Sequence, residues 1–279
     1  MEFKTLTGGF KLPVLGIGTW GMGGNREKDT THDKEDITAI KTAIELGMIH
    51  IDTAEIYGAG HTEELVREAI KGFDRSKIFI TSKVSSINLK YDDVIAAAKR
   101  SLKRLNTNYM DLYLIHGPNP DIPIEETMKA MDFLMHKKLV KNIGVSNFSV
   151  EELKEAQKCT KNKIVANQIE YNLSVRNRGR FTRNMESEII PYCQENDIFI
   201  VAWRPLALGL LAKPGFDTLD RMAKKYNKTR AQIALNWLIS KKNVVTIVKA
   251  ANVEHIKENL GVLGWRLEQE DMAILDKGL

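Results

Sequence analysis

Residues 48–58 read Met-Ile-His-Ile-Asp-Thr-Ala-Glu-Ile-Tyr-Gly, an apolar run that ends in a polar turn containing a glycine. With the two-residue period of a β-strand, Met48, His50 and Asp52 share one face. A carboxylate at the last inward position of an apolar strand is costly to bury unless it has a partner or a task. Asp52 could cap the following turn or belong to a site, and Tyr57 can reach over the same strand end.

The rest of the chain repeats the alternation of strand and helix that begins here. Strand-like runs cover residues 14–19, 48–54, 78–84, 110–116, 142–146, 164–171, 198–203 and 244–249. Segments with helical spacing cover residues 36–46, 62–72, 91–105, 124–138, 150–158, 184–196, 217–240, 252–260 and 268–277. Capping boxes are indicated at Ser149 with Glu152 and at Thr229 with Gln232.

Eight strands, each followed by a helix and joined without a linker, predict an α/β fold of the (β/α)8 TIM-barrel type. We expect one domain over residues 1–279, with an N-terminal β-hairpin around Gly8-Gly9. A doubly wound sheet is the alternative. The pair Gly16 and Gly18 lacks the third glycine of the dinucleotide fingerprint, and a long polar loop follows it where that fold needs a helix.

Composition narrows the range of partners. The chain has 279 residues, 43% hydrophobic, and a net charge of +5 spread without a long basic run, which favours an anionic small molecule over nucleic acid. Cys159 and Cys193 lie far apart and form no metal-type spacing, so we expect reduced thiols and no metal site. No apolar run is long enough to span a membrane, and the N-terminus lacks the features of a signal peptide. We expect a cytoplasmic protein, as a monomer or small homo-oligomer.

Polar or aromatic residues end nearly every predicted strand. Active sites of barrels lie at the carboxyl ends of the strands, and stability requires none of these side chains there. Their convergence on one rim therefore predicts a site. In chain order the residues are Gly18, Thr19 and Trp20, then Asp52 with Tyr57 beyond it, Lys83, His116, Ser146 and Asn147, Gln168, Trp203 and Arg204, and Lys249.

Four of these residues suit the protonation of a carbonyl oxygen. A lysine ammonium beside Tyr57 is expected to lower the phenol pKa from its reference of about 10. Asp52 would keep Lys83 charged, and His116 could donate a hydrogen bond to the carbonyl. None of the four is placed as an obvious nucleophile. A hydride would complete the reaction, and protein side chains cannot supply one, so a nicotinamide cofactor is implied.

The chain resembles the aldo-keto reductase superfamily over nearly its whole length. The matching pieces are Gly-Ile-Gly-Thr-Trp (16–20), Asp-Thr-Ala-Glu-Ile-Tyr-Gly (52–58), Thr-Ser-Lys-Val (81–84), Asp-Leu-Tyr-Leu-Ile-His (111–116), Gly-Val-Ser-Asn-Phe (144–148), Asn-Gln-Ile-Glu-Tyr-Asn (167–172) and Lys249 through Asn259. The resemblance implies a catalytic tetrad, with Tyr57 as acid and base. The other tetrad members are Asp52, Lys83 and His116.

The same resemblance assigns the cofactor and substrate contacts. Ser146, Asn147 and Gln168 match the residues that hold the nicotinamide carboxamide, and Trp203 matches the aromatic that stacks on the ring. Trp20 and Ile56 are expected to line the substrate pocket with Tyr57 and His116. Arg204 departs from the family, which usually carries Ser there; it could bind the cofactor pyrophosphate or a substrate carboxylate, or equally form a structural ion pair. The remaining predicted cofactor contacts are Gly18, Thr19, Trp20, Asp52 and Leu206.

The adenine end departs from the family pattern. Lys249 can pair with a 2′-phosphate, but the usual hydroxyl is replaced by Ala250 and the usual guanidinium by His255. Glu258 and Asn259 match the pattern. An imidazole is mostly neutral near pH 7 and binds phosphate less well than a guanidinium. We expect NADP(H) as cofactor, with NAD(H) as the alternative.

The sequence thus predicts NAD(P)H-dependent reduction of small aldehydes, sugar-derived ones included, with ketones as a further class. The first alternative is an aldolase that uses Lys83 as a Schiff-base nucleophile. The second is a non-enzymatic barrel that binds a nicotinamide cofactor as a sensor. The complete set of Asp52, Tyr57, Lys83 and His116 counts against the second alternative.

Overall fold

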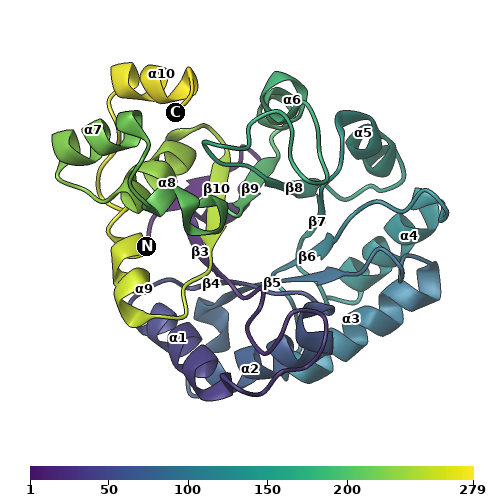
Figure 1. The fold of residues 1–279 in the computed structure, drawn as a ribbon. Coiled ribbons are helices and arrows are strands. Elements are labelled where there is room, and N and C mark those ends of the chain that lie inside the picture. The colour runs from purple at the N-terminus through teal and green to yellow at the C-terminus, as the bar shows by residue number, and fades with distance from the viewer.

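A closed barrel of eight parallel strands forms the centre of the protein, which is described for residues 1–279 by a computed structural model (Figure 1). The order around the barrel is β10-β3-β4-β5-β6-β7-β8-β9, so neighbours in sequence are neighbours in space. The prediction of a (β/α)8 barrel is confirmed. The strands are β3 (Leu15–Gly18), β4 (His50–Asp52), β5 (Phe79–Val84), β6 (Leu112–Ile115), β7 (Ile143–Ser146), β8 (Ile164–Glu170), β9 (Phe199–Trp203) and β10 (Val244–Val248).

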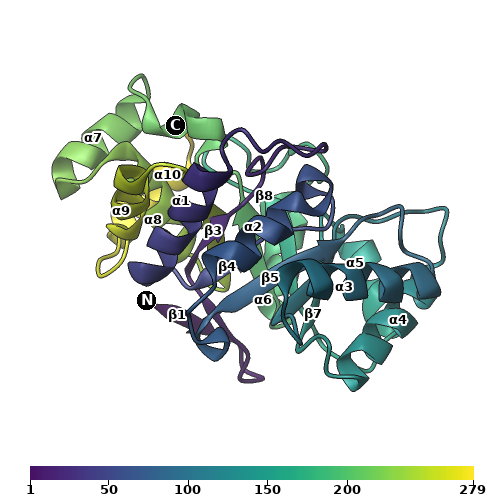
Figure 2. The same ribbon diagram turned by 90° about the horizontal axis from the view of Figure 1, so that it is seen from below.

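The predicted hairpin is also present, and it closes one end of the barrel. Strands β1 (Phe3–Thr5) and β2 (Lys11–Pro13) pair antiparallel around a turn in which Gly9 has φ 88°. The ring of Phe10 lies 6.1 Å from that of Phe79 and 5.9 Å from that of Phe199, which stand at the starts of β5 and β9. Figure 2 shows the hairpin at one end of the barrel and the loop after β3 at the other. The carboxyl ends of the strands are therefore left open for a site.

Helices surround the barrel and bury its outer face (Figure 1). A cluster of 62 buried apolar residues fills the space between strands and helices. None of the helices combines the length and the apolar character needed to cross a membrane. The α-helices are α1 (Asp33–Glu45), α2 (His61–Ala69), α3 (Tyr91–Leu105), α4 (Ile124–His136), α5 (Val150–Lys158), α6 (Ile190–Glu195), α7 (Asp217–Tyr226), α8 (Arg230–Ser240), α9 (Val253–Leu260) and α10 (Gln269–Asp276).

Two predicted helices differ from the structure. The single helix expected over 217–240 is wrong, because Asn227 takes a left-handed conformation (φ 49°) and ends α7. Thr229 then opens α8 with a complete capping box, as its pairing with Gln232 indicated. The segment predicted over 184–196 begins as a π-helical turn over 185–189 before α6, and π-turns give no distinct sequence signal.

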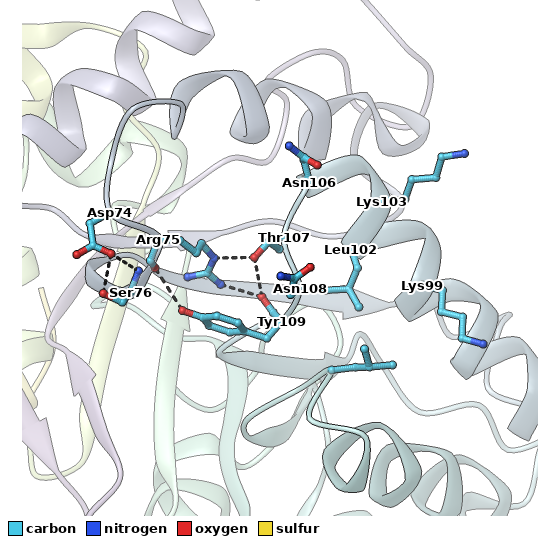
Figure 3. Close-up of a pocket in the computed structure, with 11 residues that line it drawn as sticks. Asp74, Arg75, Ser76, Lys99, Leu102, Lys103, Asn106, Thr107, Asn108 and Tyr109 are labelled. Atoms are coloured by element: carbon cyan, nitrogen blue, oxygen red, sulfur yellow. Dashed lines mark hydrogen bonds between the residues drawn. The ribbon is translucent and has the colours of Figure 1, made fainter.

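A cavity at the closed end is structural in character. It measures about 880 Å³ and lies beside the starts of β5 and β6 (Figure 3). Arg75 lines it and donates to Thr107 Oγ1 at 2.9 Å, to the Ile78 carbonyl at 2.6 Å and to the Tyr109 carbonyl at 2.9 Å. These bonds tie together the turns that precede two strands. The hydrogen bonds of Arg75 therefore stabilise the barrel.

Candidate active site

The buried ion pair between Lys83 and Asp52 is the centre of the open rim. The Lys83 Nζ lies 2.5 Å from Asp52 Oδ1, and the two side chains are 0% and 2% exposed. It also donates to the Thr53 carbonyl at 2.8 Å and to the Tyr57 hydroxyl at 3.3 Å. Asp52 stands in register with Thr81, two residues before Lys83 on the adjacent strand. The register of the two strands thus brings the Asp52 carboxylate and the Lys83 ammonium together.

Tyr57 is held over this pair by a tight turn after β4. Gly58 follows it with φ 53°, and a Cβ at that position would lie 2.4 Å from the Gly23 carbonyl oxygen. Only a glycine allows the loop after β3 to approach so closely. The Tyr57 ring meets the rings of Trp20 and His116 edge to face, with centroids 4.9 Å and 5.6 Å away. The predicted tetrad and one predicted pocket wall therefore lie together.

A second polar group lies beside the first, at the ends of β7 and β8. Ser146 Oγ donates to the Gln168 carbonyl at 2.9 Å, and Asn147 Nδ2 donates to Ser146 Oγ at 3.0 Å and to the His116 carbonyl at 3.2 Å. Gln168 Nε2 donates to Asp52 Oδ2 at 2.8 Å. The sequence did not predict this last bond, which joins the two groups into one network. Gln168 Oε1 accepts no hydrogen bond within the protein.

Trp203 and Arg204 follow at the end of β9. Trp203 Nε1 donates to Asn147 Oδ1 at 3.3 Å, which fixes the plane of the indole beside the amide group. Arg204 has φ 52°, and its guanidinium lies 5.1 Å from the Trp203 ring centroid and 3.5 Å from Glu170 Oε1. The structural ion pair considered for Arg204 is thus present. Leu206, half-buried, begins the turn that continues from this strand.

The predicted adenine-end residues divide between a cleft and the core. A cleft of about 1130 Å³ is lined by Lys249 and His255, whereas Ala250 and Asn259 are buried. The Glu258 carbonyl accepts a bond from Gln232 Nε2 at 2.8 Å, which anchors α9 to α8. The opposite wall of the cleft is the loop after β3. Sequence reasoning treated that loop only as a long polar connection, although its three glycines and two basic residues in Gly21–Lys28 were a usable signal.

Gly18, Thr19 and Ile56 complete the predicted set. Gly18 pairs in register with Asp52, and Thr19 Oγ1 donates to the Asp52 carbonyl at 2.9 Å. Thr19 is fully buried, and its side chain fixes the strand end. Ile56 is half-buried and directly precedes Tyr57.

Comparison with known proteins decides the family. The family model described as "Aldo/keto reductase family" matches residues 14–279. The chain belongs to the aldo/keto reductase family. This reductase is 36% identical to methylglyoxal reductase YeaE of Escherichia coli (strain K12), over 97% of this chain and 92% of that protein. It is 35% identical to a glyoxal reductase of Bacillus subtilis (strain 168), over 97% and 90%.

Solved structures give the same assignment. The thermostable aldo-keto reductase Tm1743, in complex with the inhibitor epalrestat, is 44% identical with a TM-score of 0.93, covering 99% of both chains. An aldo-keto reductase of Klebsiella pneumoniae in complex with NADPH is 32% identical with a TM-score of 0.87, covering 99% of this chain and 95% of the other. The resemblance inferred from the sequence motifs is confirmed, and the protein is an NAD(P)H-dependent oxidoreductase.

The ionisation of the reductase site differs from the sequence expectation at Tyr57. Burial raises the pKa of the Tyr57 hydroxyl, and the Lys83 ammonium offsets only part of that rise. The expected net lowering is wrong for the protein alone, because the cost of a buried phenolate exceeds the attraction of one ammonium that Asp52 already neutralises. Burial opposes the charge on Lys83, yet the Asp52 carboxylate outweighs it and raises the Lys83 pKa. The site therefore holds a charged lysine beside a protonated tyrosine.

His116 is neutral in this environment. Burial, helped by the Lys83 ammonium, lowers the pKa of His116 to about 3. Its backbone N–H donates to the Val84 carbonyl at 2.9 Å, and its Nδ1 is buried without a partner. A neutral imidazole carries one N–H and can donate one hydrogen bond without adding a charge.

Proposed function

We propose that this reductase reduces small aldehydes with NADPH, and that the Tyr57 hydroxyl protonates the carbonyl oxygen. The observation that carries the proposal is the buried cluster in which Lys83 Nζ contacts both Asp52 and the Tyr57 hydroxyl, at 2.5 Å and 3.3 Å. Reduction of a carbonyl needs a proton donor of this kind.

The residues around the cluster fit a nicotinamide. A carboxamide needs both hydrogen-bond acceptors and donors, and Gln168 Oε1 is a free acceptor beside the hydroxyl of Ser146 and the amide of Asn147. The Trp203 indole, held by Asn147, offers a flat face for stacking. When bound, the nicotinamide supplies the hydride that adds to the carbonyl carbon. NADPH-bound relatives with this fold support the choice of cofactor.

The protein's own groups account for the proton. As the carbonyl carbon gains two electrons and a hydrogen, negative charge develops on its oxygen. The Tyr57 O–H bond breaks and its proton passes to that oxygen, while the Lys83 ammonium, 3.3 Å away, stabilises the phenolate left behind. His116 aligns the oxygen by donating one neutral hydrogen bond. Solvent then returns a proton to Tyr57. In the reverse direction the phenolate would remove the proton from an alcohol.

The pocket beside the cluster is open on one side, so the relatives rather than its walls indicate the substrate. A Cβ built on Gly117, next to His116, meets nothing within 4 Å, so the wall beside the carbonyl site is open. Apolar side chains stand exposed around the same rim, among them Trp20, Ile87 and Phe181. Relatives named methylglyoxal reductase and glyoxal reductase reduce short dicarbonyl aldehydes. We therefore propose 2-oxoaldehydes first, followed by sugar-derived aldehydes and ketones.

A panel assay tests this function. Glyoxal, methylglyoxal, a sugar aldehyde and an aromatic aldehyde are each supplied with NADPH and with NADH, and cofactor oxidation is followed by absorbance. We expect turnover with NADPH and a higher kcat/KM for the short dicarbonyls than for the sugar aldehyde. Absence of turnover with every aldehyde and both cofactors would refute the proposal, and a protein that binds NADPH without turnover would support the sensor alternative.

The aldolase alternative is disfavoured by the environment of Lys83. A Schiff-base lysine must lose its proton to attack a carbonyl, whereas Asp52 raises the Lys83 pKa. Borohydride added with an aldehyde should leave Lys83 unmodified, and a covalent adduct there would revive the aldolase. We also propose that residues 1–279 form one domain, and that the protein is cytoplasmic and a monomer or small homo-oligomer.

A further inference from the structure

The cleft between the loop after β3 and the start of α9 extends the proposed cofactor site. The predicted contacts from Ser146 to Lys249 lie at the carboxyl ends of β7, β8, β9 and β10, which are consecutive around the barrel, and the next strand is β3. An extended dinucleotide that begins at Ser146 and passes Trp203 would therefore place its far end beside Lys249. At that point the loop formed by residues 21–29 faces it across the cleft of about 1130 Å³. This inference rests on the proposed use of a nicotinamide dinucleotide.

Lys249 alone is a weak phosphate ligand in this cleft. Its Nζ lies against the backbone of Gly21, 3.2 Å from where a Cβ of that glycine would stand. The Asp36 carboxylate, held by the Gly23 N–H at 2.9 Å, lies close enough for the Lys249 charge to lower its pKa, against the larger effect of burial, which raises it. Asp36 therefore offsets part of the positive charge that a phosphate would meet.

The lining as a whole does not attract anions. Four carboxylates and three permanent cations face the cleft, so its selectivity depends on which cations are free to contact a ligand. Asp29 is engaged by the Thr31 N–H at 2.9 Å, and Lys28 is directed to Glu64, 3.8 Å away. His255 is exposed on the other wall, and an imidazole lacks the fork of N–H groups and the permanent charge of a guanidinium.

Arg26 is the cation that remains. It lines the cleft, it is exposed, and it makes no hydrogen bond or ion pair with the protein. A guanidinium presents a fork of N–H groups that matches two phosphate oxygens, which an ammonium does not. We propose that Arg26 binds the 2′-phosphate of NADP(H) together with Lys249. Arg26 thereby determines the preference for NADP(H) over NAD(H), which differs from it only by that phosphate.

The test compares two neighbouring charge-removing variants, Arg26→Ala and Lys28→Ala. Each variant loses one positive charge from the same loop, but only Arg26 is placed to contact the ligand. Lys28→Ala therefore controls for the loss of long-range electrostatic attraction between the loop and the phosphate. The probes are adenosine 2′,5′-bisphosphate and adenosine 5′-monophosphate, titrated by calorimetry without aldehyde or turnover. We expect Arg26→Ala to raise the dissociation constant of the bisphosphate about tenfold and that of the monophosphate less than about twofold. Lys28→Ala should change both by less than about threefold.

Steady-state kinetics provide the second readout. Arg26→Ala should raise KM for NADPH about tenfold, leave KM for NADH unchanged and leave kcat nearly unchanged, and Arg26→Lys should restore part of the loss. Equal weakening by Arg26→Ala and Lys28→Ala, or no loss of bisphosphate binding in Arg26→Ala, would overturn the inference. Wild-type protein that bound the bisphosphate through Arg26 yet reduced no aldehyde would contradict the proposed function and still support the Arg26 site.

Discussion

Replacing Lys83 with methionine would show how strongly the central ion pair is coupled. The substitution keeps an unbranched apolar chain as far as Cε and removes the ammonium, which leaves the Asp52 carboxylate buried with one remaining donor, Gln168 Nε2 at 2.8 Å. Both members of the pair are essentially unexposed, so the loss is not reduced by solvent screening. Removing one partner of such a pair costs about 3–5 kcal/mol of unfolding free energy.

The measurement is urea unfolding at pH 7, followed by tryptophan fluorescence, for wild type, Lys83→Met, Asp52→Asn and the double variant. The double variant removes both charges, so we expect it to be about 2 kcal/mol more stable than Lys83→Met alone. Turnover should be lost in both, because neither contains the ammonium beside Tyr57. Wild-type stability in Lys83→Met, or strictly additive losses in the double variant, would refute the coupling.

Three further predictions concern buried histidines and a close backbone contact. Burial lowers the pKa of His50 to about 4. The folded protein therefore resists protonation of His50, and the free energy of unfolding falls as the pH drops below about 6.5, the pKa of histidine in the unfolded chain. Urea unfolding should show a loss of about 2 kcal/mol at pH 5 relative to pH 7, and a smaller loss in His50→Gln. The His116 pKa of about 3 predicts a kcat/KM profile without a histidine ionisation between pH 5 and 8, and an inflection near 6.5 that disappears in His116→Ala would contradict it. Gly144→Ala should destabilise by about 1–3 kcal/mol, because its Cβ would meet the Ala166 carbonyl at 2.8 Å, and an unchanged melting temperature would count against this.

The sequence predicted the barrel and its rim because both depend on local patterns. Strand periodicity placed Asp52 and Lys83 at the inward ends of neighbouring strands, and parallel register then brought them together. The break at Asn227 was missed although the capping box at Thr229 had been identified, because the apolar spacing continues across it. A complete N-terminal signal inside a predicted helix should be given more weight than continuous periodicity.

The features that the sequence did not reveal depend on distances between remote segments. The bond from Gln168 to Asp52 joins residues 116 positions apart, and no local pattern encodes it. The raised pKa of Tyr57 depends on its burial beneath neighbouring loops, which the composition of its own loop does not indicate. Arg26 lies in the loop that the sequence indicates only as a long polar connection, because its position across the cleft from Lys249 appears only when β10 and β3 pair to close the barrel.

The most direct test of the account is the single-turnover rate of Tyr57→Phe with NADPH and methylglyoxal, measured by stopped-flow absorbance beside cofactor binding by fluorescence. The substitution removes one hydroxyl and keeps the ring that contacts Trp20 and His116. The account predicts a dissociation constant for NADPH within about twofold of wild type and a rate of NADPH oxidation lower by about 10²–10⁴-fold. A variant that oxidised NADPH at the wild-type rate would contradict the assignment of Tyr57 as the proton donor.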